Sequence, residues 1–211
     1  MSSERDGLPR LEAAYELLPR NCILADVGCD HGMLCKAALE GGKAKRVYAC
    51  DISAPSLDKA RKVLNGFDNV QFVCCDGLKK VPRDYTAVTL CGMGGETVLE
   101  ILQGLDRDVS LIVQPQTHAA DVRRTLSGSG YALKREILAF ERGRFYPVML
   151  FERGERRLDE LEETFGLNAH EPSPLLVKMA EKLIREHEKY PQNPRSSEIL
   201  RLARTVTENV K

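Results

Sequence analysis

Apolar, β-favouring runs alternate with helical patterns from residue 22 to residue 127, and this alternation limits the possible folds more than any other feature. The runs with strand character are Cys22–Val27, Arg46–Cys50, Val70–Cys74, Ala87–Cys91 and Ser110–Gln114. Helical patterns precede, separate or follow them at Leu11–Leu18, Met33–Glu40, Ala54–Leu64, Glu96–Gln103 and Ala119–Ser127. Strands joined through helices form parallel sheets, so the sequence predicts an α/β fold with a doubly wound sheet.

The rhythm changes after residue 130. Tyr131–Phe140 and Phe145–Phe151 both have strand character and are joined by only four residues, 141–144. A connection this short joins antiparallel neighbours, so we expect a mostly parallel sheet with one antiparallel strand inserted by a hairpin. This layout is similar to the Rossmann-like sheet of class I methyltransferases, whereas dinucleotide-binding domains normally continue with a parallel strand.

From Gly154 onward the chain is polar and charged, with few β-forming residues. Helices are expected at Leu158–Phe165, Pro174–Tyr190 and Ser196–Val210, and the last two flank the breaker Pro191–Pro194. We therefore predict two parts, a domain at residues 1–154 and a helical, coiled-coil-like C-terminal arm at residues 155–211. A structural appendage and a substrate-gripping or dimerising arm are equally compatible with this pattern, and the oligomeric state stays open.

Composition excludes several classes of protein. Lys and Arg number 31, as do Asp and Glu, so any affinity for nucleic acid must come from a local patch. No apolar run approaches the roughly 18 residues of a membrane span and the first residues are polar, so we expect a cytoplasmic protein without a membrane partner. None of the seven cysteines forms a C-x2-C pair, which favours buried, reduced thiols and no metal.

The first strand runs into a turn of glycine and acidic residues, with the sequence Ala25-Asp26-Val27-Gly28-Cys29-Asp30-His31-Gly32. Small residues at this point let the backbone approach a ligand at the carboxyl end of the strand. A dinucleotide site needs G-x-G-x-x-G, but Asp30 occupies the position of the middle glycine and would repel a diphosphate. S-adenosylmethionine carries a sulfonium, an ammonium and no phosphate, so carboxylates in this turn are compatible with its binding or assist it. His31 is expected to orient the cofactor rather than to transfer protons.

Acidic residues also end the next two strands. Asp51, followed by Ile52, lies about twenty residues beyond the glycine turn, where a carboxylate accepts hydrogen bonds from ribose hydroxyls. Asp76, followed by Gly77, is a candidate acceptor for an adenine amino group. Each acid alone would be a helix cap more often than a ligand, but together at one sheet edge they favour a nucleoside site.

The fourth and fifth strands complete that edge. The fourth ends in Cys91-Gly92-Met93-Gly94-Gly95, with exposed backbone beside the expected methyl donor, and lacks the Asn/Asp-Pro-Pro-Tyr/Phe common in adenine N6-methylating enzymes. The fifth ends in Gln114-Pro115-Gln116, a polar rim. His118, shortly after, is expected to be a surface or capping residue.

At these residues the sequence resembles the bacterial tRNA adenine-22 N1-methyltransferases. The likeness runs through Leu11–Gly154 and is carried by Ala25–His31, Asp76-Gly77-Leu78, Cys91–Gly95 and Gln114-Pro115, with Pro174-Leu175-Leu176 also similar. It implies an S-adenosylmethionine-dependent enzyme that methylates N1 of adenine 22 in tRNA. The chain departs from the family in Cys29, in Gly32–Cys35, in Gln116 and in its shorter, less basic tail.

The resulting site has three parts. The catalytic residue is expected to be Asp30, whose carboxylate would receive adenine amino protons as positive charge develops on the base. The cofactor is expected to bind Asp26, Gly28, Asp30, His31, Asp51, Ile52, Asp76, Gly77, Cys91, Gly92 and Met93. The substrate is expected to meet Gly94, Gln114 and Pro115.

Three alternatives remain open from the sequence. They are a methyltransferase acting on rRNA, protein or a small molecule, a non-catalytic cofactor- or RNA-binding scaffold, and, less favoured, a nicotinamide oxidoreductase. A tRNA partner also needs basic residues near the site, and the candidates are Arg5, Arg10, Arg20, Arg123, Arg124, Arg142 and Arg144.

Overall fold

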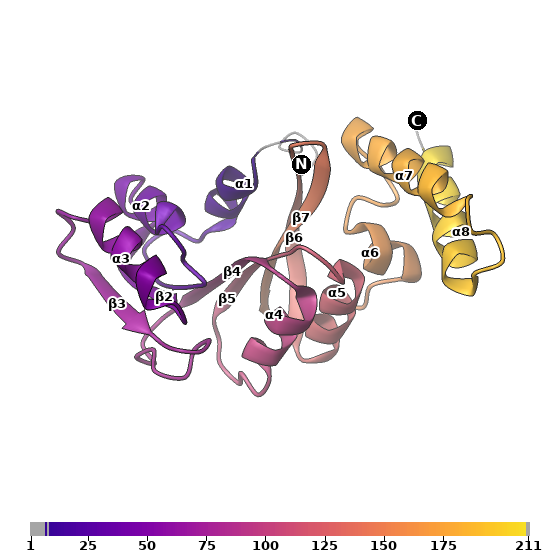
Figure 1. Ribbon diagram of the computed structural model, residues 1–211. Coiled ribbons are helices and arrows are strands. Elements are labelled where there is room, and N and C mark those ends of the chain that lie inside the picture. Colours follow the sequence, from indigo (N-terminus) through magenta and orange to yellow (C-terminus); the bar gives the residue numbers. More distant parts are fainter. Residues whose placement is uncertain (1–6, 8, 210–211) are drawn as a thin grey trace.

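A seven-stranded sheet forms the centre of the molecule in a computed structural model that describes residue 7 and residues 9–209 (Figure 1). Its strand order is β3-β2-β1-β4-β5-β7-β6. The strands are β1 (Cys22–Val27), β2 (Ala44–Asp51), β3 (Val70–Cys74), β4 (Ala87–Met93), β5 (Ser110–Pro115), β6 (Tyr131–Glu141) and β7 (Arg144–Arg153). The pairs among β1 to β5 are parallel, as the alternation with helices predicts.

Helices cover both faces of this sheet. The helices are α1 (Arg10–Leu17), α2 (Met33–Glu40), α3 (Ala54–Val63), α4 (Gly95–Leu102) and α5 (Ala119–Gly128). Apolar residues of α1, α2 and α3 share one core with alternate strand residues, and those of α4 and α5 share a second core with the opposite set. The predicted α/β class and doubly wound layout are confirmed.

The expected hairpin is also confirmed. Strand β7 pairs antiparallel with both β5 and β6, so it lies between them as the one strand of reversed direction. Glu141 faces Arg144 in the register, which leaves Arg142 and Gly143 as a two-residue turn. Both have positive φ angles, 51° and 76°, as the tightest hairpin turns require.

The C-terminal segment consists of α6 (Glu160–Phe165), α7 (Pro174–His187) and α8 (Pro194–Glu208). Helices α7 and α8 lie side by side as the predicted helical hairpin, beyond the β6 edge of the sheet (Figure 1). They share a third hydrophobic cluster with α6 and with Leu138 of β6. This cluster packs the C-terminal helices against the edge strand β6.

Most expected boundaries agree with the structure to within a few residues, with three informative differences. The helix expected from Leu158 begins at Glu160, because Asp159 caps it by accepting from the amides of Leu161 and Glu162, both at 2.9 Å. The helix expected to reach Tyr190 ends at His187. The last helix begins earlier than expected, at Pro194, with Asn193 as its cap, and Val210 lies outside the described residues.

Candidate functional site

A cavity of about 350 Å³ opens at the carboxyl ends of β1, β4 and β5. The predicted site residues that line it are Asp26, Gly28, Asp30, His31, Cys91, Gly92 and Gln114. Two larger hollows, of about 550 and 590 Å³, flank the C-terminal end of α4. Ligands of open α/β sheets bind at the carboxyl ends of the strands, so the smaller cavity is the candidate site.

The glycine turn after β1 has a backbone that only small or special residues adopt. Gly28 has a φ of 72°, and a Cβ atom there would lie 3.1 Å from the Cε of Met93. The amides of Gly28 and Cys29 both donate to the carbonyl of Cys50, at 2.9 Å, which ties the turn to the end of β2. The turn therefore exposes backbone to the cavity while its position is fixed.

Asp26 is a buried acid below this turn, with only 4% of its surface exposed. Its carboxylate accepts hydrogen bonds from the hydroxyl of Thr89 at 2.6 Å and from the thiol of Cys35 at 3.1 Å. Burial raises the pKa of Asp26, although both hydrogen bonds oppose that rise and the nearby Asp51 adds to it. A cationic ligand in the cavity would stabilise the ionised form of Asp26.

Asp30 is joined to its neighbours on both sides. It has a φ of 46°, a conformation that Asp and Asn tolerate better than most residues. Its amide donates to a carboxylate oxygen of Asp51 at 3.1 Å, and its own carboxylate lies 2.5 Å from Nδ1 of His31. The other oxygen of Asp51 accepts from the amide of Ser53 at 2.8 Å. The structure thus connects three predicted site residues, and Asp30 and His31 remain half exposed beside the cavity.

Three of the residues expected to bind the cofactor, Ile52, Asp76 and Gly77, lie apart from this cavity. Ile52 is 73% exposed at the end of β2. Asp76 is exposed and paired with Lys79, and with Gly77 it lines the neighbouring hollow of about 590 Å³. Gly77 has a φ of 56°, and a Cβ there would lie 3.1 Å from Ile101, so the turn after β3 also requires glycine. The roles expected for Ile52, Asp76 and Gly77 stay predictions.

The ends of β4 and β5 are joined by two glutamine side chains. Gln114 is buried, accepts from the amide of Gly92 at 3.1 Å and donates to the carbonyl of Pro115 at 3.1 Å. Gln116 donates to the carbonyl of Gly92 at 2.8 Å. Gly92 therefore holds its 81° φ angle between two amide side chains. Gln114 braces this turn, where a polar rim was expected, and its contact with substrate stays a prediction.

The nearby Gly94 and His118 are both found at helix starts. Gly94 is the N-cap residue of α4, and His118 is the exposed N-cap residue of α5. The surface position expected for His118 is confirmed. Gly95 cannot be replaced without movement, because a Cβ there would lie 2.6 Å from the carbonyl oxygen of Thr117.

Three thiols surround Asp26. Cys29 and Cys91 line the cavity and Cys35 donates to Asp26, and all seven cysteines are free. Burial raises the pKa of each of these three thiols, and the charge of Asp26 raises it further. Of the seven, Cys74 is exposed and Cys91 is half-buried, so the expectation of buried thiols holds for the other five. The described residues contain no group of three or more metal-ligating side chains.

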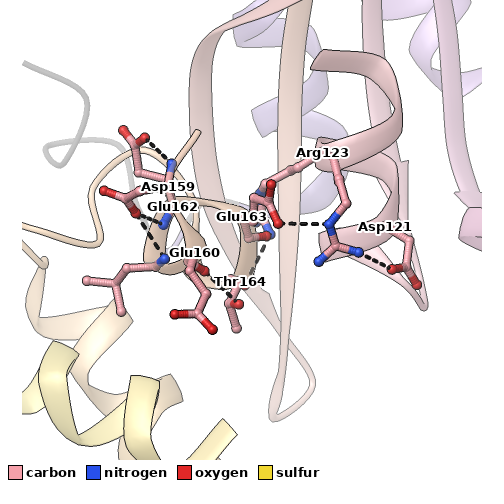
Figure 2. A network of polar contacts seen from close by, with 9 residues as sticks. Asp121, Arg123, Asp159, Glu160, Glu162, Glu163 and Thr164 are labelled. Atoms are coloured by element: carbon pink, nitrogen blue, oxygen red, sulfur yellow. Dashed lines mark hydrogen bonds and ion pairs between the residues drawn. The ribbon is translucent and has the colours of Figure 1, made fainter. Parts of the chain in front are cut away.

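The candidate RNA-contacting arginines fall into different surroundings. Arg123 was a candidate but is wrong as an RNA contact, because its side chain is only 2% exposed and forms an ion pair with Glu136. Arg124 is exposed and donates to Glu163 of α6 at 2.8 Å and to Asp121 of its own helix at 3.1 Å. Figure 2 shows Asp121 and Arg123 of α5 beside Glu163 and Thr164 of α6. The other exposed candidates are Arg20, Arg142 and Arg144, while Arg5 lies outside the described residues.

Two residues that line the cavity, Arg10 and Glu141, contact each other although the sequence does not predict their pairing. Arg10 at the start of α1 donates through Nε to Glu141 at the end of β6, at 2.8 Å, and both line the cavity. They are separated by 131 residues in the chain. The sequence identifies Arg10 only as one of several basic residues, and no periodicity or motif links it to the hairpin.

Comparisons with known proteins agree with this geometry. A family model described as "Methyltransferase domain" matches residues 8–149. The tRNA (adenine(22)-N(1))-methyltransferase of Bacillus subtilis (strain 168) is 34% identical over 157 residues, which cover 70% of this chain. The matched region spans 65% of the length of that relative.

Two solved structures are similar over nearly the whole chain. The crystal structure of Streptococcus pneumoniae Sp1610 has a TM-score of 0.85 and 26% identity, and the match covers 95% of this chain and 97% of that one. The structure of M. capricolum TrmK in complex with S-adenosyl-homocysteine has a TM-score of 0.82 and 25% identity, and the match covers 94% of this chain and 95% of that one.

Among the described residues, none of the helices has the length and apolar character of a membrane span.

The sheet order, the inserted antiparallel strand, the acid-lined turn after β1 and these matches all agree with the resemblance seen in the sequence. The chain therefore belongs to the methyltransferase domain family, and within that family it is similar to the bacterial tRNA adenine-22 N1-methyltransferases.

Proposed function

We propose that this protein transfers a methyl group from S-adenosylmethionine to N1 of adenine 22 in tRNA. The observation that carries the proposal is the acid-lined cavity at the carboxyl ends of β1, β4 and β5, in a chain that is 34% identical to a tRNA (adenine(22)-N(1))-methyltransferase. A tRNA substrate would place this activity in the cytoplasm.

The residues of the cavity fit such a cofactor. Asp26, Asp30 and Asp51 have no Lys or Arg partner among the residues that the structure describes, so a ligand with sulfonium and ammonium groups would supply the opposite charge. Gly28 has no Cβ, so the space beside Met93 that a side chain would occupy stays open. A similar structure, that of M. capricolum TrmK, contains S-adenosyl-homocysteine.

Each predicted residue has a proposed task. Asp51 and Asp76 hold the ribose and the adenine of the cofactor, with Ile52 and Gly77 beside them. Asp26, Gly28, Asp30 and His31 surround its methionine part, while Cys91, Gly92 and Met93 shape the pocket. Gly94, Gln114 and Pro115 form the side from which the substrate enters. Bound S-adenosylmethionine supplies a methyl group activated by its sulfonium.

The chemistry requires alignment more than a strong base. N1 of neutral adenine has an available lone pair, so the protein must orient the base and exclude water. As N1 gains a bond, positive charge spreads to the amino group, and we assign Asp30 to accept the amino protons in hydrogen bonds. The base must leave the folded tRNA core to reach the cavity.

The cavity and the C-terminal segment belong to two proposed parts of the chain. Residues 1–154 would form the cofactor-binding domain, and residues 155–211 would form the helical arm. Helix α7 has an amphipathic pattern whose apolar side packs in the third hydrophobic cluster, where Leu176 and Ala180 are buried.

The test is incorporation of labelled methyl from S-adenosylmethionine into unmodified tRNA by the purified protein, followed by nucleoside analysis. We expect 1-methyladenosine, and a tRNA with another base at position 22 should not be methylated. If the protein binds S-adenosylmethionine but leaves tRNA unmodified, the substrate assignment is wrong, and rRNA, protein and small molecules become the next substrates to assay.

A further inference from the structure

The cavity is strongly acidic for a site that must admit a nucleic acid. Asp26, Asp30 and Glu141 line it, and Asp51 is bonded to the amide of Asp30. A phosphodiester backbone that brings a nucleotide to this cavity is repelled by each ionised carboxylate. Some group at the cavity must offset this repulsion.

Arg10 is the one Lys or Arg side chain among the described residues that line the cavity. It is held from two directions by the β6–β7 hairpin. Nε donates to Glu141 at 2.8 Å, and the guanidinium carbon lies 4.7 Å from the ring centre of Tyr146. The hydrogen bond to Arg10 also keeps the pKa of Glu141 below its usual range, so the pair is ionised at neutral pH. The guanidinium is therefore oriented before any ligand arrives.

The orientation leaves Arg10 able to bind a second anion. A guanidinium has five N–H donors, and the bond to Glu141 uses the one on Nε. The Arg10 side chain is 34% exposed, so solvent and ligands reach it. Planar, forked donors fit phosphate oxygens better than a single ammonium does. By contrast, Arg123 is buried in its ion pair and cannot bind a phosphate.

We propose that Arg10, held by Glu141 and Tyr146, binds a phosphate of the nucleotide whose base enters the cavity. Arg10 is then a substrate-binding residue, and Glu141 is a positioning residue that acts through it. The inference rests on the proposed tRNA substrate and adds the contact by which that substrate is held at the cavity.

The test measures how the dissociation constant for tRNA depends on salt concentration. Each lost phosphate contact lowers the slope of log Kd against log salt by about 0.7 to 0.9. We expect Arg10→Gln to lower the slope by about that amount and to raise Kd for tRNA about tenfold at low salt. Its affinity for S-adenosylmethionine should match the wild type, which also shows that it is folded.

Two further variants control the interpretation. Arg46 is another half-exposed arginine, and its one carboxylate partner among the described residues is Asp84. It lies on β2, near the edge of the sheet opposite to β6. Arg46→Gln should therefore leave the slope and the Kd for tRNA unchanged. Arg10→Lys keeps the charge, and we expect the wild-type slope with a Kd raised about threefold, because the forked donors are lost.

An unchanged slope in a folded Arg10→Gln protein overturns the inference. If the Arg10→Gln protein is misfolded and fails to bind S-adenosylmethionine, the Arg10→Lys protein becomes the test. A wild-type Kd for tRNA in the Arg10→Lys protein then overturns the inference. A wild-type protein that binds tRNA without methylating it contradicts the proposed function and leaves this measurement possible.

Discussion

Acidic side chains lie both at the carboxyl edge of the sheet and at the junction of α5, β6 and α6, but the groups that surround them differ. At the junction, Glu136 forms a buried ion pair with Arg123 and accepts from the amide of Leu167 at 3.3 Å. Arg123 also donates to the carbonyls of Glu163 and Thr164, at 2.9 and 3.1 Å. At the carboxyl edge, Asp26 and Asp51 accept only from amide, hydroxyl and thiol groups in the described part of the chain.

This difference separates a structural use of charge from a binding use. A buried pair whose partners satisfy each other stabilises the local packing, here of α5 against β6, and the bonds from Arg123 to the carbonyls of Glu163 and Thr164 attach α6. An acid without a basic partner raises the free energy of the unliganded protein, and a cation that binds beside it lowers that free energy again. The comparison therefore predicts that changes at the junction affect stability, and that changes at the carboxyl edge affect binding and turnover.

The largest effect is expected at the junction. Glu136→Gln would leave the guanidinium of Arg123 buried without an opposite charge, which costs about 3–5 kcal/mol of the free energy of unfolding. Urea unfolding followed by circular dichroism measures it. Arg124→Gln removes a neighbouring but exposed arginine and should cost about 0–1 kcal/mol. Equal losses in the two variants would show that the buried pair has no special role.

The second effect tests Asp30. Asp30→Asn keeps a residue that tolerates the 46° φ angle but removes the charge, so we expect kcat to fall about 100-fold with S-adenosylmethionine affinity within about threefold. Single-turnover methylation of tRNA and calorimetry give the two values. Asp58→Asn, an exposed change on α3, is the control. A wild-type kcat in the Asp30 variant would remove this carboxylate from catalysis.

A smaller effect is expected at the glycine turn. Gly28→Ala places a methyl group 3.1 Å from the Cε of Met93 at a φ of 72°, so Met93 or the turn must move at the cavity, and cofactor affinity should fall about tenfold, which corresponds to about 1.4 kcal/mol. Gly66→Ala has a similar positive φ, 96°, but its methyl group meets nothing within 4 Å. It should lose stability without losing affinity. If both variants bind S-adenosylmethionine equally well, the turn does not hold the cofactor.

The smallest effect concerns the pH dependence of stability. The pKa of Asp26 is raised in the folded protein, so folding favours its protonated form, and its ionisation destabilises the fold as pH rises above the unfolded value of about 3.9. Asp26→Asn should therefore raise Tm at pH 8, with a gain that shrinks toward pH 4, and should weaken S-adenosylmethionine binding. Melting curves across this pH range test it, and a Tm gain that is independent of pH would contradict the assignment to ionisation.

The sequence predicted the parts of the fold that repeat locally and missed contacts that depend on the final topology. Strand and helix positions follow from periodicity and turn residues, and the acids after β1, β2 and β3 follow from their place at strand ends. The Asp159 capping box was readable as an acid three residues before Glu162. The burial of Arg123 and the pairing of Arg10 with Glu141 depend on where the hairpin inserts, which no local pattern specifies.

The protonated thiols around Asp26 have a further consequence for a protein that handles an alkylating cofactor. A thiolate is the strongest nucleophile among the side chains, and one beside an activated methyl group would capture it irreversibly. Because burial and the charge of Asp26 raise the pKa of Cys29, Cys35 and Cys91, these sulfur atoms stay in their unreactive form. Under the proposed function, the acids that would attract the cofactor would thus also protect these thiols from methylation.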